Sequence, residues 1–128
     1  MLRDWRQGCF ASVLALFATM AVAPNAAMAA DGKKVFNKCK ACHTVKEGGK
    51  NRVGPALFGI VGRKSASVAG YKYSKAMQGW GGTWTEDNLK TYLENPRKFI
   101  KGNKMAFPGL KKPEQIDAVI AFIKAGGK

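Results

Sequence analysis

Two cysteines and the only histidine of the chain fall within five residues, at Cys39, Cys42 and His43. On a helix, residues three and four positions apart share a face, so both thiols and the imidazole would point the same way. This C-x-x-C-H spacing is typical of c-type haem attachment, in which the thiols bond the haem vinyl groups and the imidazole meets the iron. We therefore predict one covalently bound haem, with its iron, as the cofactor.

Other uses of the motif fit less well. A structural zinc site needs four ligands, and only these three side chains are present, with Cys42 and His43 adjacent in the chain. A thioredoxin-like redox pair needs a preceding strand and a βαβ frame, which the pattern lacks. A chance match is the remaining alternative, and the export signal and poor core described below argue against it.

A haem iron held by one imidazole needs a sixth ligand unless its open side binds a substrate or a gas. Because no second histidine exists, the candidates are Met77, Met105 or a lysine. Met77 falls on a predicted short helix, whereas Met105 falls in a loop that could lay one side chain across a flat cofactor. A single methionine more often packs in the hydrophobic core than binds a metal. Loop position alone favours Met105 over Met77 and leaves both open.

The first 29 residues have the pattern of a secretory signal peptide. Arg3 and Arg6 precede an apolar run over residues 9–23, and Ala27 and Ala29 provide the small residues of a cleavage site. The run is shorter than the ~20 residues that span a bilayer, which favours cleavage over an uncleaved anchor. We predict a signal peptide at 1–29, a mature domain at 30–128 and a location in the periplasm.

Helical periodicity dominates the mature chain. Helices are predicted over residues 32–42, 74–79, 85–95, 96–100 and 113–125. The glycine-rich stretch 44–73 is predicted to be loop and turn. No window alternates with period two, so the predicted class is all-α, with three to five short helices and long loops.

Helices this short bury little apolar surface, and domains of about 100 residues are marginal in stability. A loop of about thirty residues in a compact domain also needs a reason. We therefore expect the long loops to wrap around the haem, which would form most of the core.

Residues 32–124, nearly the whole mature chain, resemble the class I cytochromes c of the mitochondrial and alphaproteobacterial type. The matching segments are CKACHTV at 39–45, GPALFG at 54–59, GRK at 62–64, GYKY at 70–73, Trp84, YLENP at 92–96 and GNKM at 102–105. The resemblance implies the small cytochrome c fold around one covalent haem. It also implies thioethers at Cys39 and Cys42 and axial ligation of the iron by His43 and Met105.

The resemblance further implies contacts around the cofactor. It places the carbonyl of Pro55 on the ring N–H of His43, and Tyr92 near the sulfur of Met105. The residues that it groups around an inner haem propionate are Arg63, Tyr73 and Trp84.

The resemblance also implies that the first helix, at Gly32 and Phe36, crosses the last helix near Phe122. Two residues depart from the family pattern: Asn103 stands where threonine is frequent, and Pro108 where alanine or glycine is common. We expect neither residue to touch the ligands, so only the stiffness of this loop should differ.

A six-coordinate His/Met haem has no open position for a substrate, so the predicted function is one-electron transfer between membrane redox complexes, and not an enzymatic reaction. The alternative is an open-site haem enzyme or a gas-binding sensor, which requires that Met105 does not bind the iron. The spectrum of the ferric protein discriminates between the two. A nucleic-acid or membrane-surface binder, suggested by charge alone, is disfavoured by export and by the lack of a groove-reading motif.

The chain carries 22 Lys and Arg against 8 Asp and Glu, a net charge of +14, and removal of residues 1–29 leaves +13. The resemblance places seven basic residues around the exposed haem edge: Lys38, Arg52, Arg97, Lys98, Lys104, Lys111 and Lys112. We expect them to meet acidic docking faces on a quinol–cytochrome c reductase, a terminal oxidase, a photosynthetic reaction centre or a periplasmic dehydrogenase.

Electron transfer should then slow as salt rises. Charge reversal at Lys98 or Lys104 should cost more rate than reversal at Lys124. We expect a monomer that binds no nucleic acid and has no stable membrane insertion.

Overall fold

A computed structural model describes residues 30–128, so the predicted signal peptide lies outside the described residues. The helices are α1 (Gly32–Phe36), α2 (Lys75–Trp80), α3 (Glu86–Glu94), α4 (Pro96–Phe99) and α5 (Pro113–Lys124). Within this described part no strand forms, and extended pairing is limited to one antiparallel bridge between Lys64 and Thr83. The predicted all-α class with three to five short helices is confirmed.

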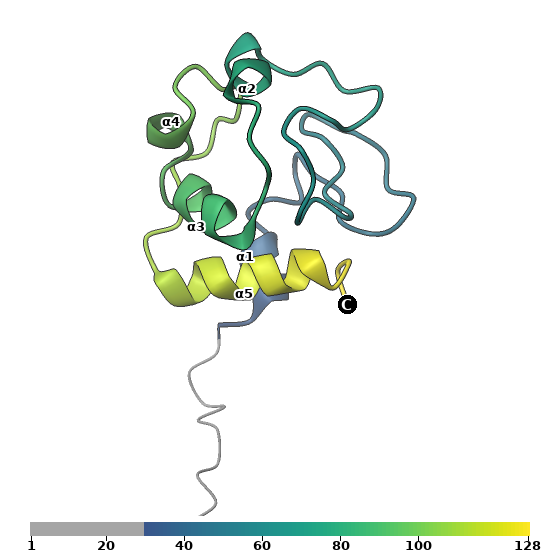
Figure 1. The fold of residues 1–128 in the computed structure, drawn as a ribbon. Helices are drawn as coiled ribbons and strands as arrows, with labels where there is room; N and C mark the ends of the chain where they lie inside the picture. Colours follow the sequence, from purple (N-terminus) through teal and green to yellow (C-terminus); the bar gives the residue numbers. More distant parts are fainter. Residues whose placement is uncertain (1–29) are drawn as a thin grey trace, which may run out of the picture.

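Three helix contacts organise the molecule: α1 with α5, α3 with α5, and α3 with α4. Figure 1 shows α5 along the base, with α1 crossing it, and α2 at the opposite end of the molecule. The long loops between α1 and α2 form one flank, and α3 and α4 form the other. None of the described helices is long and apolar enough to cross a membrane.

The crossing of α1 over α5 depends on a glycine. A Cβ atom at Gly32 would overlap the carbonyl of Ala118 and would lie 2.8 Å from the Cβ of Phe122. The rings of Phe36 and Phe122 pack with their centroids 5.4 Å apart. The predicted crossing is therefore confirmed, and the missing side chain at Gly32 is what allows the backbones to approach.

The helix predicted over residues 32–42 is too long. α1 ends at Phe36, and the following residues form consecutive turns instead of a continuous ladder of i→i−4 bonds. The amide of Cys39 donates to the carbonyl of Phe36 at 2.8 Å, and the amide of Cys42 donates to the carbonyl of Cys39 at 3.0 Å. These turns carry the chain into the loop flank, where His43 is fastened, and this tertiary contact outweighs the local helical periodicity.

Three of the other helices begin directly after a capping side chain. Ser74 caps α2, Thr85 caps α3 and Asn95 caps α4, each by accepting a backbone N–H of the first turn. Prolines open α4 and α5, in the position where their missing N–H costs least.

The buried core is small. Its helical part is formed by the apolar faces of α1, α3 and α5, and includes Val119, Ile120 and Leu89. A set of apolar side chains is only partly buried against it, including Cys39, Leu57, Met77, Met105 and Phe107. The helices alone therefore leave the apolar side chains of both flanks incompletely covered.

Four aromatic rings join α2, α3 and α4 into a closed cluster. Trp80 packs on Trp84 at 4.7 Å between centroids and on Phe99 at 5.3 Å. Tyr92 packs on Trp84 at 4.9 Å and on Phe99 at 6.1 Å. Tilted and edge-on contacts of this kind hold aromatic side chains in defined orientations, so the ring of Tyr92 is fixed from two sides.

Candidate functional site

The two cysteines of the motif lie half-buried in the turns after α1 and form no disulfide. Burial raises the pKa of the Cys39 thiol to about 11, so this thiol stays protonated at neutral pH. Zinc binding and thiol–disulfide chemistry both use the thiolate. The described residues also hold no group of three His, Cys, Asp or Glu side chains placed to bind a metal ion. The motif itself supplies three donor side chains, one fewer than a structural zinc site needs.

His43 is held by one backbone carbonyl. Its Nδ1 lies 2.7 Å from the carbonyl oxygen of Pro55, as the resemblance implies. Because a carbonyl only accepts, Nδ1 carries the proton and Nε2 keeps a free lone pair. Burial lowers the pKa of His43 below its ordinary value, against a smaller opposite effect of the Pro55 bond. The imidazole is therefore neutral at pH 7, which is the form that binds a metal ion.

Gly54 packs directly against the ring of His43. A Cβ atom here would overlap the ring, lying 2.7 Å from Nδ1 and 2.8 Å from Nε2. The amide of Gly54 also donates to the carbonyl of Cys42 at 2.8 Å, which closes the loop onto the motif. The sequence offered Gly54 only as part of a matching segment, and its role as the wall beside the imidazole is visible only in three dimensions.

Met105 lies in the loop between α4 and α5, half-buried, with its sulfur 3.7 Å from the hydroxyl of Tyr92. Burial raises the pKa of Tyr92 well above its usual range, so the hydroxyl remains a donor. The expectation that Tyr92 lies near Met105 is therefore confirmed. The expectation that Asn103 affects only stiffness is wrong in one respect, because its Oδ1 accepts the amide N–H of Met105 at 2.8 Å.

Met77, the other candidate ligand, lies on α2 as predicted. Its amide donates to the capping hydroxyl of Ser74 at 3.1 Å, and its carbonyl accepts from the buried hydroxyl of Ser65 at 3.0 Å. The backbone at Met77 is thus fixed within a capped helix, whereas Met105 lies outside any helix.

The three residues expected around a propionate are each fixed locally. Arg63 donates from Nη2 to the carbonyl of Phe58 at 2.8 Å, and the hydroxyl of Tyr73 accepts the amide of Val68 at 3.2 Å. Trp84 is buried, and its amide donates to the carbonyl of Arg63 at 2.8 Å. Their grouping around a propionate stays a prediction.

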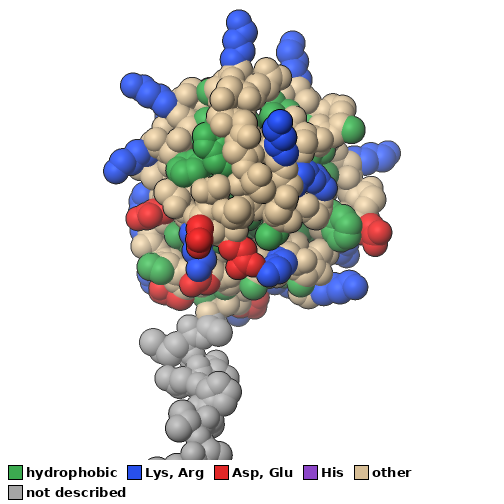
Figure 2. Space-filling model, in the orientation of Figure 1, with side chains coloured by type: hydrophobic (Ala, Val, Ile, Leu, Met, Phe, Trp, Pro, Cys, Tyr) green, Lys and Arg blue, Asp and Glu red, His purple; other side chains and the backbone are tan. Residues whose placement is uncertain are grey.

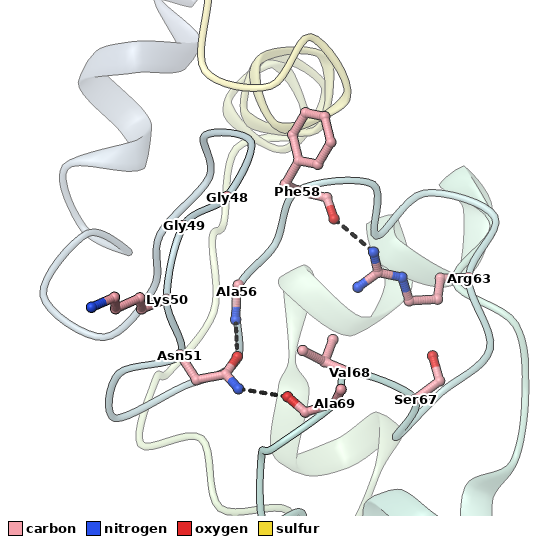
Figure 3. A pocket seen from close by; sticks show the side chains of 10 residues that line it. All are labelled: Gly48, Gly49, Lys50, Asn51, Ala56, Phe58, Arg63, Ser67, Val68 and Ala69. Atoms are coloured by element: carbon pink, nitrogen blue, oxygen red, sulfur yellow. Dashed lines mark hydrogen bonds between the residues drawn. The ribbon is translucent and has the colours of Figure 1, made fainter.

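A groove of about 680 Å³ lies between the loops at residues 48–51 and 63–69. Asn51 ties the walls together, accepting the amide of Ala56 and donating to the carbonyl of Ala69, both at 2.9 Å (Figure 3). None of the four predicted thioether and iron-ligand residues lines this groove, but Arg63, which is expected at a haem propionate, does.

Charge is distributed unevenly over the molecule. No Asp or Glu occurs in residues 48–85 or 95–113, although these stretches contain twelve Lys and Arg. Figure 2 shows the acidic side chains gathered in the lower half of this face, at the level of α3 and α5, and basic side chains projecting around the upper half. Ion pairs Lys90–Asp117, at 2.9 Å, and Lys124–Glu86 link α3 to α5. On the side that the figure shows, the end of the molecule away from α5 therefore carries basic side chains without acidic ones.

Some of the seven predicted docking residues also have structural contacts. Lys104 donates to the carbonyl of Lys72 at 2.7 Å, Lys111 donates to that of Glu94 at 3.2 Å, and Arg52 donates to that of Lys40 at 2.8 Å. The exposed side chains of the other four, Lys38, Arg97, Lys98 and Lys112, make no such contact within the described residues. Charge changes at these four positions therefore report on docking with less disturbance of the fold.

These features fit a covalently attached c-type haem. The motif supplies two free thiols, and His43 supplies a neutral imidazole with Nε2 available. Met105 supplies a thioether of the soft kind that haem iron accepts. The incompletely covered apolar side chains of both flanks fit a flat apolar cofactor.

Comparison with known proteins decides the family. Residues 29–126 match the sequence profile of the family described as Cytochrome c. The chain belongs to the cytochrome c family. Cytochrome c2 of Afifella marina is 50% identical over 100 residues, which cover 76% of this chain and 81% of the relative. Cytochrome c-554 of Methylosinus trichosporium is 46% identical over 122 residues, which cover 91% of this chain and 92% of the relative.

The solved structure of cytochrome cH from Methylobacterium extorquens is similar to this fold, with a TM-score of 0.70 and 44% identity. The match covers 76% of this chain and 97% of the Methylobacterium protein. The predicted family and fold are thereby confirmed. Members of the cytochrome c family carry electrons on covalently bound haem c, and Cys39, Cys42 and His43 provide its C-x-x-C-H motif.

Proposed function

We propose that this cytochrome c is a periplasmic one-electron carrier. In this proposal Cys39 and Cys42 form the two thioethers, and His43 and Met105 are the axial ligands of the iron. Haem c supplies one-electron exchange at its iron when bound. The observation that carries the proposal is the fixed ring of His43, whose bond to Pro55 leaves a neutral imidazole with Nε2 free.

Each ligand is oriented by a second residue. Pro55 fixes the tautomer of His43 and increases the basicity of its other ring nitrogen. Tyr92 directs its hydroxyl at the sulfur of Met105. Because methionine is a weak, soft ligand, this pair favours the reduced state and a raised potential.

The proposed ligand set excludes an enzymatic role at the iron. If His43 and Met105 both bind the iron, they would leave no ligand position for a substrate or a gas. The second candidate, an open-site haem enzyme or gas sensor, requires that Met105 does not bind. The contact between Tyr92 and Met105 favours the carrier because it already holds the sulfur in one place.

We further propose that residues 1–29 export the chain and are removed after Ala29. Support comes from the basic start, the apolar run and the small residues before Ala30. The mass of the protein recovered from the periplasm tests the cleavage position.

The proposed partners present acidic docking faces, as on a quinol–cytochrome c reductase, a terminal oxidase or a photosynthetic reaction centre. The acid-free stretches at 48–85 and 95–113 support this, since the second one contains the ligand loop. A positive face steers association with an acidic one and orients it. The carrier is proposed to act as a monomer.

The test of the proposed function compares Met105→Ala with Met77→Ala in the haem-loaded protein. Met105→Ala should lower the reduction potential, change the ferric spectrum and allow imidazole to bind, because the weak axial ligand is lost. Met77→Ala should leave all three close to the original protein. A large effect of Met77→Ala with none of Met105→Ala would reverse the assignment, and no effect of either would favour the open-site alternative.

A further inference from the structure

The side-chain amide of Asn103 makes three hydrogen bonds. Its Nδ2 donates to the carbonyl oxygens of Pro96 and Ile100, each at 2.8 Å. Its Oδ1 accepts the amide N–H of Met105 at 2.8 Å. The side chain is half-buried, and both amide hydrogens and the carbonyl oxygen have protein partners.

These bonds connect α4 to the ligand loop. The carbonyls of Pro96 and Ile100 stand at the start and at the C-cap of α4. Each also accepts one backbone N–H, from Ile100 and from Asn103 respectively, so the Asn103 amide uses the second lone pair of each oxygen. Gly102 has φ +89°, so the chain reverses direction just before Asn103. One amide therefore fixes the start of the loop to α4 and, through the next bond, fixes the backbone of Met105.

We propose that Asn103 is a positioning residue that holds Met105 in place and limits its displacement by other ligands. This inference rests on the proposed function, in which the sulfur of Met105 binds the iron. The backbone of Met105 cannot swing away from α4 without breaking the bond to Asn103. The occupancy of the sixth position then depends on the integrity of this amide.

Few side chains could replace asparagine here. A serine or threonine hydroxyl has one donor, so it cannot serve two carbonyls. An aspartate has the shape of asparagine but only acceptor atoms when ionised, and it would face two carbonyl oxygens. Losing two of these hydrogen bonds should favour the released loop by about tenfold or more.

The experiment measures imidazole affinity of the ferric, haem-loaded protein for Asn103→Asp and Asn103→Ala. The matched control is Asn51→Asp, which removes another bridging amide and adds the same charge. The native Asn51 side chain connects the groove loops and does not touch the ligand loop. Apparent affinity should rise about tenfold in both Asn103 variants, since it scales with the fraction of protein in the competent state. Asn51→Asp should lower stability to denaturant and leave imidazole affinity within about twofold.

The outcomes separate the inference from its basis. Unchanged imidazole affinity in both Asn103 variants, with strong binding by Met105→Ala, would overturn the positioning role and leave Met105 as ligand. Equal gains in the Asn103 variants and in Asn51→Asp would also overturn it, because general loosening would then explain the effect. If Met105→Ala itself changes neither potential nor imidazole binding, the proposed function fails. If Asn103→Asp does not incorporate haem, the imidazole affinity of Asn103→Ala, which adds no charge, decides the test.

Discussion

The hydroxyl of Tyr92 on α3 lies 3.7 Å from the sulfur of Met105, thirteen residues later in the chain. The ring of Tyr92 packs against Trp84 and Phe99, and its burial keeps the hydroxyl protonated by raising its pKa. The rigidly held hydroxyl of Tyr92 therefore donates to Met105, which lies in a loop outside any helix. Through Tyr92, the aromatic cluster thus helps to hold the sulfur of Met105, the proposed ligand, in one position.

Replacing Tyr92 with phenylalanine should lower the reduction potential. The O–H donor withdraws electron density from the sulfur, so its removal strengthens donation to the iron and favours the ferric state. A weak bond of about 0.5–1 kcal/mol corresponds to about 20–45 mV at 59 mV per tenfold. Potentiometric titration of Tyr92→Phe checks the sign, and a rise in potential would contradict it.

Gly54→Ala should disturb the site through His43. The new methyl group would overlap the imidazole, which must then move away from Pro55. Overpacking of this kind costs about 1–3 kcal/mol of the free energy of unfolding, and haem incorporation should fall with it. Denaturant unfolding and the yield of haem-loaded protein measure both effects.

The matched control is Gly79→Ala, in the last turn of α2, where a Cβ meets nothing within 4 Å. Alanine there should be neutral or should stabilise by up to about 1 kcal/mol, as a better helix former. Equal losses at the two glycines would show that contact with His43 is not the cause.

Lys98→Glu should slow electron transfer more than Lys33→Glu at the same net charge. Lys98 follows Pro96 on α4, ahead of the ligand loop, whereas Lys33 is exposed on α1. The electron-transfer rates of the two variants with a quinol–cytochrome c reductase should also differ more at about 0.01 M than at about 0.15 M salt. The reason is that the Debye length falls from about 30 Å to about 8 Å over this range.

Lys33 is a better control than Lys124, which is paired with Glu86, and Lys98 a better probe than Lys104, which is bonded to Lys72. Reversing Lys124 or Lys104 would mix loss of a structural contact with loss of docking charge. Identical rate losses in Lys98→Glu and Lys33→Glu would mean that total charge alone controls association.

The mature chain made without haem should lack a cooperative unfolding transition. The helical core is small, and the apolar side chains of both flanks are only partly buried. With so small a core, we expect the chain without haem to bury too little apolar surface to offset its conformational entropy. Calorimetry and near-ultraviolet circular dichroism check this, and a sharply melting apoprotein would refute it.

Much of this protein follows from local signals in its sequence. The spacing of Cys39, Cys42 and His43 indicates the cofactor, because three positions within one turn set the possible chemistry. The starts of α2, α3 and α4 follow from Ser74 and the other capping residues, since a cap satisfies backbone groups within four residues. The all-α class follows from periodicity, which is also a local property.

Only the tertiary structure decides features that join distant segments. The helix expected through residue 42 ends at Phe36, because the chain must turn to bring His43 to Pro55. Gly54 matters through the ring that it touches, and Asn103 through carbonyls on α4. Pattern and propensity describe a segment by itself, whereas these roles depend on which atoms of other segments lie within contact distance, and that is fixed when the chain packs.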